Sequence, residues 1–205
     1  MIGIVDYGLG NIKAFLNVYN RLNIPAKIVM KPNDLINISK IVLPGVGAFD
    51  HAMVQLNKSG LRDDLERLVF KYSIPIIGIC VGMQMLAENS DEGELPGLGW
   101  IKGCVKKFDV DFIPYKTKLP HMGWNTIKIL NNNELFNGFN SDEKFYFLHS
   151  FYFDALNSNN VITSTTYGKE FASSVVNKNI YGVQFHPEKS HINGINLLKN
   201  FASIC

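Results

Sequence analysis

The feature that most constrains the fold of this sequence is the alternation, along its first half, of short apolar runs with longer segments of helical periodicity. The apolar runs that we expect to be strands lie at residues 1–5, 26–30, 40–43 and 75–79. Residues 12–22 carry apolar side chains at helical spacing, with Asn11 placed to cap them, and helical material returns over residues 49–72 with a break near Gly60. Strands that are apolar along their whole length must be covered on both faces. The alternation therefore predicts an α/β fold, a doubly wound, flavodoxin-like, mostly parallel sheet with flanking helices.

From about Trp100 onward the pattern changes to short strands separated by turns. The strands expected in this half lie at residues 105–108, 124–130, 144–148, 161–167, 171–177 and 180–185. They predict extra antiparallel strands in the C-terminal half. A last helix is expected over residues 192–202, with a buried face made of Ile192, Ile195, Leu198 and Phe201. Because no segment repeats and the asparagine-rich stretches are typical of loops rather than linkers, we expect one domain over residues 1–205.

Size and charge exclude several classes of protein. A chain of 205 residues that is 46% hydrophobic can bury the core of one domain. Its 20 basic and 18 acidic residues are mixed along the chain, so we expect no nucleic-acid partner. No apolar run reaches the roughly 18 residues of a membrane span. The first residues favour a strand over a signal peptide, so we expect a cytoplasmic protein without a membrane partner.

The cysteines and the first glycine pair give no sign of a bound metal or cofactor. Cys80, Cys104 and Cys205 are odd in number and widely spaced, which fits neither a disulfide framework nor a zinc site. Gly8-Leu9-Gly10 lacks the third glycine of a dinucleotide-binding fingerprint. We expect no metal and no cofactor, and we expect Cys104 and Cys205 to be bystanders in any chemistry.

Cys80 stands in the most informative segment of the chain. Here an apolar run leads through Gly78-Ile79-Cys80-Val81-Gly82 into a helical stretch expected over residues 83–88. This order is that of a nucleophile elbow with a thiol in place of the hydroxyl. The sharp turn crowds the residues beside the nucleophile, so small neighbours are needed, and helix N–H groups favour the thiolate. The alternative is a buried, small apolar residue at the end of a strand.

His186 is the candidate base for this thiol, and Glu188 follows it in the same loop after the strand expected at 180–185. A thiol nucleophile needs an imidazole that takes its proton and later returns it, and the imidazole needs an acceptor that fixes its tautomer. Strand ends of one sheet converge in space, so the distance from Cys80 in sequence is no objection. Taken singly, His186 also fits a surface histidine before a turn. The histidines without an acidic residue in a comparable setting are His51, His121, His149 and His191.

A second functional loop is expected at Gly45-Val46-Gly47, which follows the third strand. Two glycines in a loop above a sheet edge let backbone N–H groups point at a developing oxyanion. A plain tight turn is the alternative explanation.

Three motifs occur in the order found in class I (triad) glutamine amidotransferases, which the sequence resembles along essentially its whole length. They are PGVGAF at 44–49, GICVGMQ at 78–84 and GVQFHPEKS at 182–190. Within that family, DYGLGN at 6–11, HMGWN at 121–125 and FYFLHSFY at 145–152 are similar to the glutaminase subunits of imidazole glycerol phosphate synthases.

The resemblance implies that Cys80 is the nucleophile, His186 the base and acid, and Glu188 the residue that orients the imidazole. The residues it implies for the α-amino and carboxylate groups of glutamine are Gln84 and the backbone of Ser150 and Phe151, and those near the oxyanion are Gly47 and Val81. Val81 and Phe151 stand where the family often has leucine and tyrosine, which leaves backbone roles unchanged.

The resemblance also implies a reaction and a partner. Glutamine would be hydrolysed through a γ-glutamyl thioester, and the ammonia would pass to a cyclase subunit with a (β/α)₈ barrel in a heterodimer. There it would form imidazole glycerol phosphate and aminoimidazole carboxamide ribotide in histidine biosynthesis. In the family, the segments at 6–11 and 121–125 lie towards the partner, and the alternative for them is a turn around a buried Trp124.

Three other functions stay open on the sequence alone. Segments 49–53 and 97–103 are similar to paralogues that feed ammonia to amidine-forming enzymes of surface-sugar pathways. A cysteine peptidase or chaperone-like hydrolase on the same scaffold also uses an elbow cysteine. A catalytically inactive binding module would keep the fold, but retention of Cys80, His186 and Glu188 argues against it.

Overall fold

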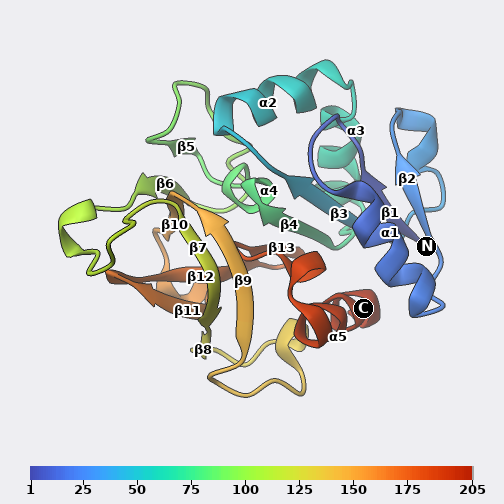
Figure 1. The fold of residues 1–205 in the computed structure, drawn as a ribbon. Coiled ribbons are helices and arrows are strands. Elements are labelled where there is room, and N and C mark those ends of the chain that lie inside the picture. Colours follow the sequence, from blue (N-terminus) through green and yellow to red (C-terminus); the bar gives the residue numbers. More distant parts are fainter. Residues whose placement is uncertain (205) are drawn as a thin grey trace.

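The structure is a computed structural model that describes residues 1–204, and Cys205 lies outside the described residues. Its main sheet has the strand order β2-β1-β3-β4-β13-β12-β10-β6-β5 (Figure 1). The strands of its first half are β1 (Ile2–Val5), β2 (Ala26–Val29), β3 (Lys40–Gly45) and β4 (Ile76–Cys80), joined late in the chain by β13 (Ile180–Val183). All neighbours within this set pair in parallel. The order 2-1-3-4-13 is the flavodoxin-like one, and the expected fold class is confirmed.

Helices cover both faces of the parallel strands. They are α1 (Ile12–Arg21), α2 (Phe49–Lys58), α3 (Arg62–Glu66), α4 (Val81–Gln84) and α5 (His191–Ser203). α1 contacts α5 on one face, whereas α2 and α3 lie on the other side of the sheet (Figure 1). Every residue of β1 and β4 is buried, because each of these strands has helices on both sides.

The second half of the chain extends the sheet with mostly antiparallel strands. They are β5 (Asn89–Ser90), β6 (Gly103–Lys107), β8 (Lys128–Ile129), β10 (Phe151–Ala155), β11 (Val161–Tyr167) and β12 (Lys169–Asn177). A separate antiparallel pair, β7 (His121–Thr126) and β9 (Lys144–His149), lies in front of this extension in Figure 1. The antiparallel strands expected in this half are therefore present.

Several local expectations were wrong. The helix expected over residues 83–88 is the single turn α4, because the carbonyl oxygens that would continue it accept backbone N–H groups from a later segment: those of Met85, Leu86 and Ala87 bond the amides of Leu98, Ile101 and Gly99. Ile192 is 64% exposed. The buried stripe of α5 starts at Gly194, and Ile192 lies two residues earlier, about 200° around the helix. Asn11 makes no side-chain capping hydrogen bond.

Among the described residues 1–204, no helix is both long and apolar enough to cross a membrane.

Candidate active site

Cys80 ends β4 at the carboxyl edge of the parallel sheet, in a strained backbone conformation with φ +54°. α4 begins at the next residue, Val81. A Cβ on Gly82 would lie 2.0 Å from the carbonyl oxygen of Leu43, and one on Gly78 would lie 2.4 Å from that of Gly82. The prediction that glycines must flank the turn is therefore confirmed. The elbow forms because β3, β4 and the turn approach one another too closely for side chains.

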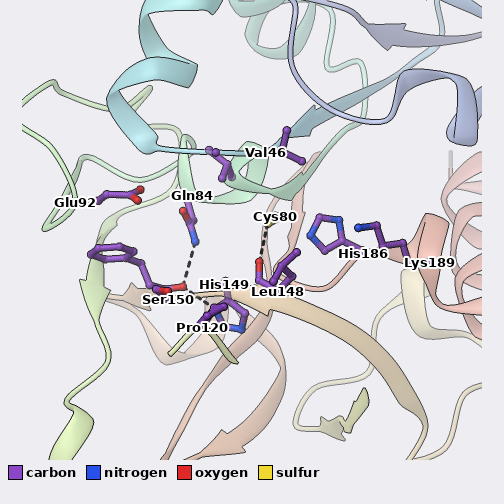
Figure 2. Close-up of a pocket in the computed structure, with 13 residues that line it drawn as sticks. Val46, Cys80, Gln84, Glu92, Pro120, Leu148, His149, Ser150, His186 and Lys189 are labelled. Carbon is purple, nitrogen blue, oxygen red and sulfur yellow. Dashed lines mark hydrogen bonds between the residues drawn. The ribbon is translucent and has the colours of Figure 1, made fainter. Parts of the chain in front are cut away.

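The Cys80 side chain borders a cavity of about 290 Å³ at this edge of the sheet (Figure 2). All the predicted site residues except Glu188 line it. They are Gly47, Cys80, Val81, Gln84, Ser150, Phe151 and His186. These residues come from loops and strands that are distant in sequence, so the fold brings together in one pocket the groups that the motifs suggested.

His186 and Glu188 form a buried pair in the loop after β13. The His186 Nδ1 atom lies 2.9 Å from Glu188 Oε1, and each side chain is 3% exposed. Since a carboxylate oxygen only accepts, Nδ1 donates to Glu188 and Nε2 is left for the pocket. The loop is fixed by two further bonds, from the His186 amide to the carbonyl oxygen of Tyr146 and from the Ser190 hydroxyl to that of His186.

The surroundings of His186 favour its charged form. Burial opposes protonation of the imidazole, but hydrogen bonds to Cys80 and Glu188, together with the negative charges of both groups, raise its pKa from 6.5 to about 10. A proton released by the thiol is therefore well held at this imidazole. Glu188 Oε2 is buried and has no hydrogen-bond partner among residues 1–204.

Two glutamine side chains connect Cys80 to the far wall of the pocket. Gln84 Nε2 donates to the carbonyl oxygen of Phe151 at 3.1 Å and to Gln184 Oε1 at 3.0 Å. Gln184 Nε2 in turn lies 3.7 Å from Cys80 Sγ, and the sulfur lies 3.8 Å from the carbonyl oxygen of Leu148. Both amide hydrogens of Gln84 are therefore used within the protein, and its Oε1 accepts no hydrogen bond from the part of the chain that the structure describes.

The loop after β3 forms the opposite rim. Val46 is 39% exposed, and Gly47 has φ +88° with nothing within 4 Å of where a Cβ would lie. Tyr7, in the loop after β1, donates its hydroxyl to the carbonyl oxygen of Pro44 at 2.7 Å and so holds the start of this rim. Burial, and next the charge of Cys80, raise the pKa of the Tyr7 phenol, which stays protonated as a donor.

Sequence reasoning missed several residues of the pocket. Glu92 and Lys189 line it, and Glu92 Oε2 accepts the backbone N–H of Phe49 at 2.9 Å. Gln184 and His149 were also missed. Glu92 stands in none of the motifs that the sequence offered, whereas His149 belongs to FYFLHSFY and both Gln184 and Lys189 belong to GVQFHPEKS, so these three could have been considered.

Other expectations concern residues away from the pocket. Cys104 is a half-buried free thiol on β6 and does not line the cavity. Within the described part of the chain, no group of three or more His, Cys, Asp or Glu side chains could hold a metal ion. Trp124 is 46% exposed, so the alternative of a turn around a buried tryptophan is wrong.

Comparison with known proteins shows the family of the chain. The family model described as glutamine amidotransferase class-I matches residues 3–205. The chain belongs to the class I glutamine amidotransferases. Two solved structures share its fold. One is a glutamine amidotransferase (TM-score 0.75, 19% identity, 99% of each chain), and the other is PurLQS from Thermotoga maritima (TM-score 0.74, 18% identity, 98% of this chain and 97% of that one).

Relatives of much higher identity share one name, imidazole glycerol phosphate synthase subunit HisH. The chain is 56% identical over 206 residues to the protein of that name from Bdellovibrio bacteriovorus, with 100% of both chains covered. It is 48% identical over 204 residues to the one from Leptospira borgpetersenii, again with 100% of both covered. A protein named subunit HisH 2 from Pseudomonas aeruginosa is 41% identical over 208 residues and 100% of both chains.

Proposed function

We propose that this chain is the glutaminase subunit of an imidazole glycerol phosphate synthase and that it supplies ammonia for a step of histidine biosynthesis. The observation that carries the proposal is the convergence of Cys80 and His186 on one pocket, with the thiol on a strained elbow and the imidazole oriented by the buried carboxylate of Glu188. Full-length relatives at 56% and 48% identity with that name support the assignment.

The first half of the reaction forms a thioester. Cys80 passes its proton to Nε2 of His186, and the thiolate attacks the side-chain amide carbon of glutamine. His186 then donates that proton to the amide nitrogen, the carbon–nitrogen bond breaks, and ammonia leaves. Glu188 stabilises the imidazolium through its bond to Nδ1.

The negative charge that develops on the amide oxygen needs N–H donors. We place the backbone N–H groups of Val81 and Gly47 in this role, because both residues line the pocket beside Cys80 and come from its two rims. Val81 is the first residue of α4, so no residue of its own helix accepts its N–H.

The amino-acid end of glutamine is held at the other end of the pocket. The free Oε1 acceptor of Gln84 and the carboxylate of Glu92 suit the α-ammonium group of the substrate. Backbone groups of Ser150 and Phe151 complete this end. Glu92 is thus a substrate-binding residue that the sequence motifs did not reveal.

The second half releases glutamate. His186 takes a proton from water as the water oxygen attacks the thioester carbon, and it returns that proton to the Cys80 sulfur when the carbon–sulfur bond breaks, which restores the thiol and releases glutamate. Ammonia released into water at neutral pH is largely converted to ammonium, which is not a nucleophile. We therefore propose direct transfer to a cyclase subunit with a (β/α)₈ barrel, in a heterodimer, where the ammonia is used.

Labelling with a glutamine analogue tests the chemistry. The diazo-ketone 6-diazo-5-oxo-L-norleucine should form one adduct, at Cys80, that excess glutamine prevents and that mass spectrometry locates. An adduct-free Cys80 in a protein that cleaves peptides instead would favour the hydrolase alternative.

The pathway is tested by adding a histidine-pathway cyclase with its ligand. Glutaminase activity should then rise. Stimulation only by an amidine-forming enzyme of a sugar pathway would contradict the pathway assignment.

A further inference from the structure

Two buried histidines that the reaction scheme does not use face each other across the β7–β9 pair. The register places His121 opposite His149, and His121 Nδ1 lies 2.9 Å from His149 Nε2. The two residues are 3% and 6% exposed. His149 lines the Cys80 pocket, His121 lines a neighbouring cavity of about 410 Å³, and Pro120 borders both cavities. The histidine pair therefore forms part of the wall between them.

The outer end of the pair fixes the direction of its hydrogen bonds. Asn125 Oδ1 accepts the backbone N–H of Thr126 at 2.8 Å, and Asn125 Nδ2 donates to the carbonyl oxygen of Thr166 at 3.0 Å. These two backbone partners leave the amide only one orientation. Asn125 Nδ2 also lies 3.2 Å from His121 Nε2, so that ring nitrogen has to be the acceptor. A neutral His121 then carries its proton on Nδ1, where it donates to His149.

The inner end gives the same direction independently. His149 Nδ1 lies 2.7 Å from the carbonyl oxygen of Phe151, which only accepts, so Nδ1 carries the proton. His149 Nε2 is then the acceptor that His121 requires. Burial lowers the pKa of both imidazoles, to about 4 for His121 and about 3 for His149, and keeps the pair neutral. An added proton on His121 Nε2 would face the N–H of Asn125, and one on His149 Nε2 would face the N–H of His121, so neither could form a hydrogen bond there.

We propose that His121 and His149 are positioning residues of the glutamine site, acting through a one-directional hydrogen-bond chain from Asn125 to the Phe151 carbonyl. The Phe151 carbonyl oxygen also accepts a hydrogen bond from Gln84 Nε2. Its position therefore sets the orientation of the Gln84 amide, in which Nε2 bonds the protein and Oε1 faces the substrate. The functional part of this inference rests on the proposed glutaminase activity. The assigned tautomers, with the proton on Nδ1 of both rings, do not depend on it.

His121→Phe is the substitution that breaks this hydrogen-bond chain while it leaves the surrounding packing in place. The His121 ring stacks on Phe147 and Tyr167, so phenylalanine keeps the packing and removes the donor to His149. His149 is then free to move its proton to Nε2 and lose the Phe151 bond. His121→Asn places an amide nitrogen near the former Nδ1 and restores the donor. Tyr167→Phe is the matched control, since Tyr167 belongs to the same stack and, within residues 1–204, its hydroxyl donates only to the carbonyl oxygens of Thr117 and Lys118.

The experiment measures histidine tautomers by NMR and glutamine hydrolysis by steady-state kinetics, both on the full chain. The synthase subunit is present in the activity measurements. Nitrogen-15 NMR of histidine-labelled protein should show both rings neutral with the proton on Nδ1, and the His121→Phe spectrum assigns them. His121→Phe should raise the glutamine KM roughly 3- to 10-fold, the worth of one hydrogen bond, with kcat and the iodoacetamide reactivity of Cys80 nearly unchanged. His121→Asn should recover most of the lost affinity, and Tyr167→Phe should behave as the wild type.

Either of two results overturns the inference. One is a wild-type spectrum with the proton on Nε2 of either ring, which is decisive even if His121→Phe does not fold. The other is an active His121→Phe protein with an unchanged glutamine KM. A wild-type complex that does not hydrolyse glutamine at all would instead refute the proposed function. The NMR spectrum would still test the assigned tautomers of His121 and His149.

Discussion

His186 and His149 line the same pocket, yet their surroundings favour opposite charge states. The hydrogen bonds and charges of Cys80 and Glu188 outweigh burial at His186 and raise its pKa to about 10. Among residues 1–204 no carboxylate bonds His149, where burial dominates and lowers the pKa to about 3. One imidazole is therefore suited to holding a proton for the chemistry, and the other to holding a fixed tautomer.

Replacing the orienting carboxylate tests the first of these roles. Glu188→Gln removes the charge that stabilises the imidazolium, so the pKa of His186 should fall and kcat for glutamine hydrolysis should drop by about 10² or more. Steady-state kinetics of the complex measure the drop, and the pH dependence of Cys80 alkylation measures the change at His186. Glu143→Gln, which alters a carboxylate bonded to Asn193, should have no such effect. Equal kcat in both variants would contradict the role of Glu188.

The neutral histidines predict how stability depends on acid. Because the pKa values of His121 and His149 are lower in the folded chain than the ordinary 6.5, the unfolded chain binds more protons below that pH. The free energy of unfolding should therefore fall as pH drops from about 6.5 towards 4. In urea titrations His121→Phe, which lacks one of these groups, should lose about 1.4 kcal/mol less per pH unit than the wild type in that range. Parallel pH profiles would show that His121 is not held neutral by the fold.

At the scale of elements, the elbow is made by the close approach of β3, β4 and α4. Gly82→Ala places a Cβ 2.0 Å from the Leu43 carbonyl oxygen, so β3 and α4 must separate. We expect a loss of roughly 2–4 kcal/mol in the free energy of unfolding, measured in urea, together with loss of glutaminase activity. Gly60→Ala is the control. Its φ is +71° but nothing lies within 4 Å, so about 1 kcal/mol and full activity are expected. A Gly82→Ala protein as active as Gly60→Ala would show that the elbow tolerates bulk.

Some strands could be predicted from the sequence and others could not. The strands β1, β3 and β4 are solid apolar runs, so their place in a covered parallel sheet was evident from pattern alone. β10 was missed because residues 145–155 form one nearly continuous apolar stretch, and only the structure shows that the chain changes sheets at Ser150, between β9 and β10. The triad was found because its residues sit in local motifs.

The two histidines also sit in motifs, HMGWN and FYFLHSFY, but no motif could show that they pair. His121 and His149 are 28 residues apart and meet only through the β7–β9 register, which depends on pairing between distant segments. Glu92 is brought to the pocket by a loop tied to the start of α2, where Asp50 accepts the backbone N–H groups of Glu94 and Leu95. Such residues become visible only when the tertiary contacts are known.

At the scale of the whole molecule, apolar side chains are exposed close to the active site. Met122 is 64% and Trp124 46% exposed on β7, and Trp124 stacks on His191 with ring centroids 5.1 Å apart. We expect this face to contact the synthase subunit. Trp124→Ala should weaken the complex at least about tenfold in titration calorimetry, as a buried aromatic anchor would. Leu156→Ala, at an apolar residue that is 80% exposed, should not. Equal affinities would place the interface elsewhere.

The central claim is that Cys80 releases from glutamine the ammonia that a partner subunit consumes. The most direct test measures product formation by the complex of the Cys80→Ala chain with its cyclase subunit, first with glutamine and then with ammonium salt as the nitrogen source. Cys104→Ala is the matched control, because this free thiol does not line the pocket. Cys80→Ala should reduce the glutamine-dependent rate by at least about 10³ and leave the ammonium-dependent rate within about twofold of the wild type. Glutamine-dependent synthesis that survives, or ammonium-dependent synthesis that disappears, would contradict the account.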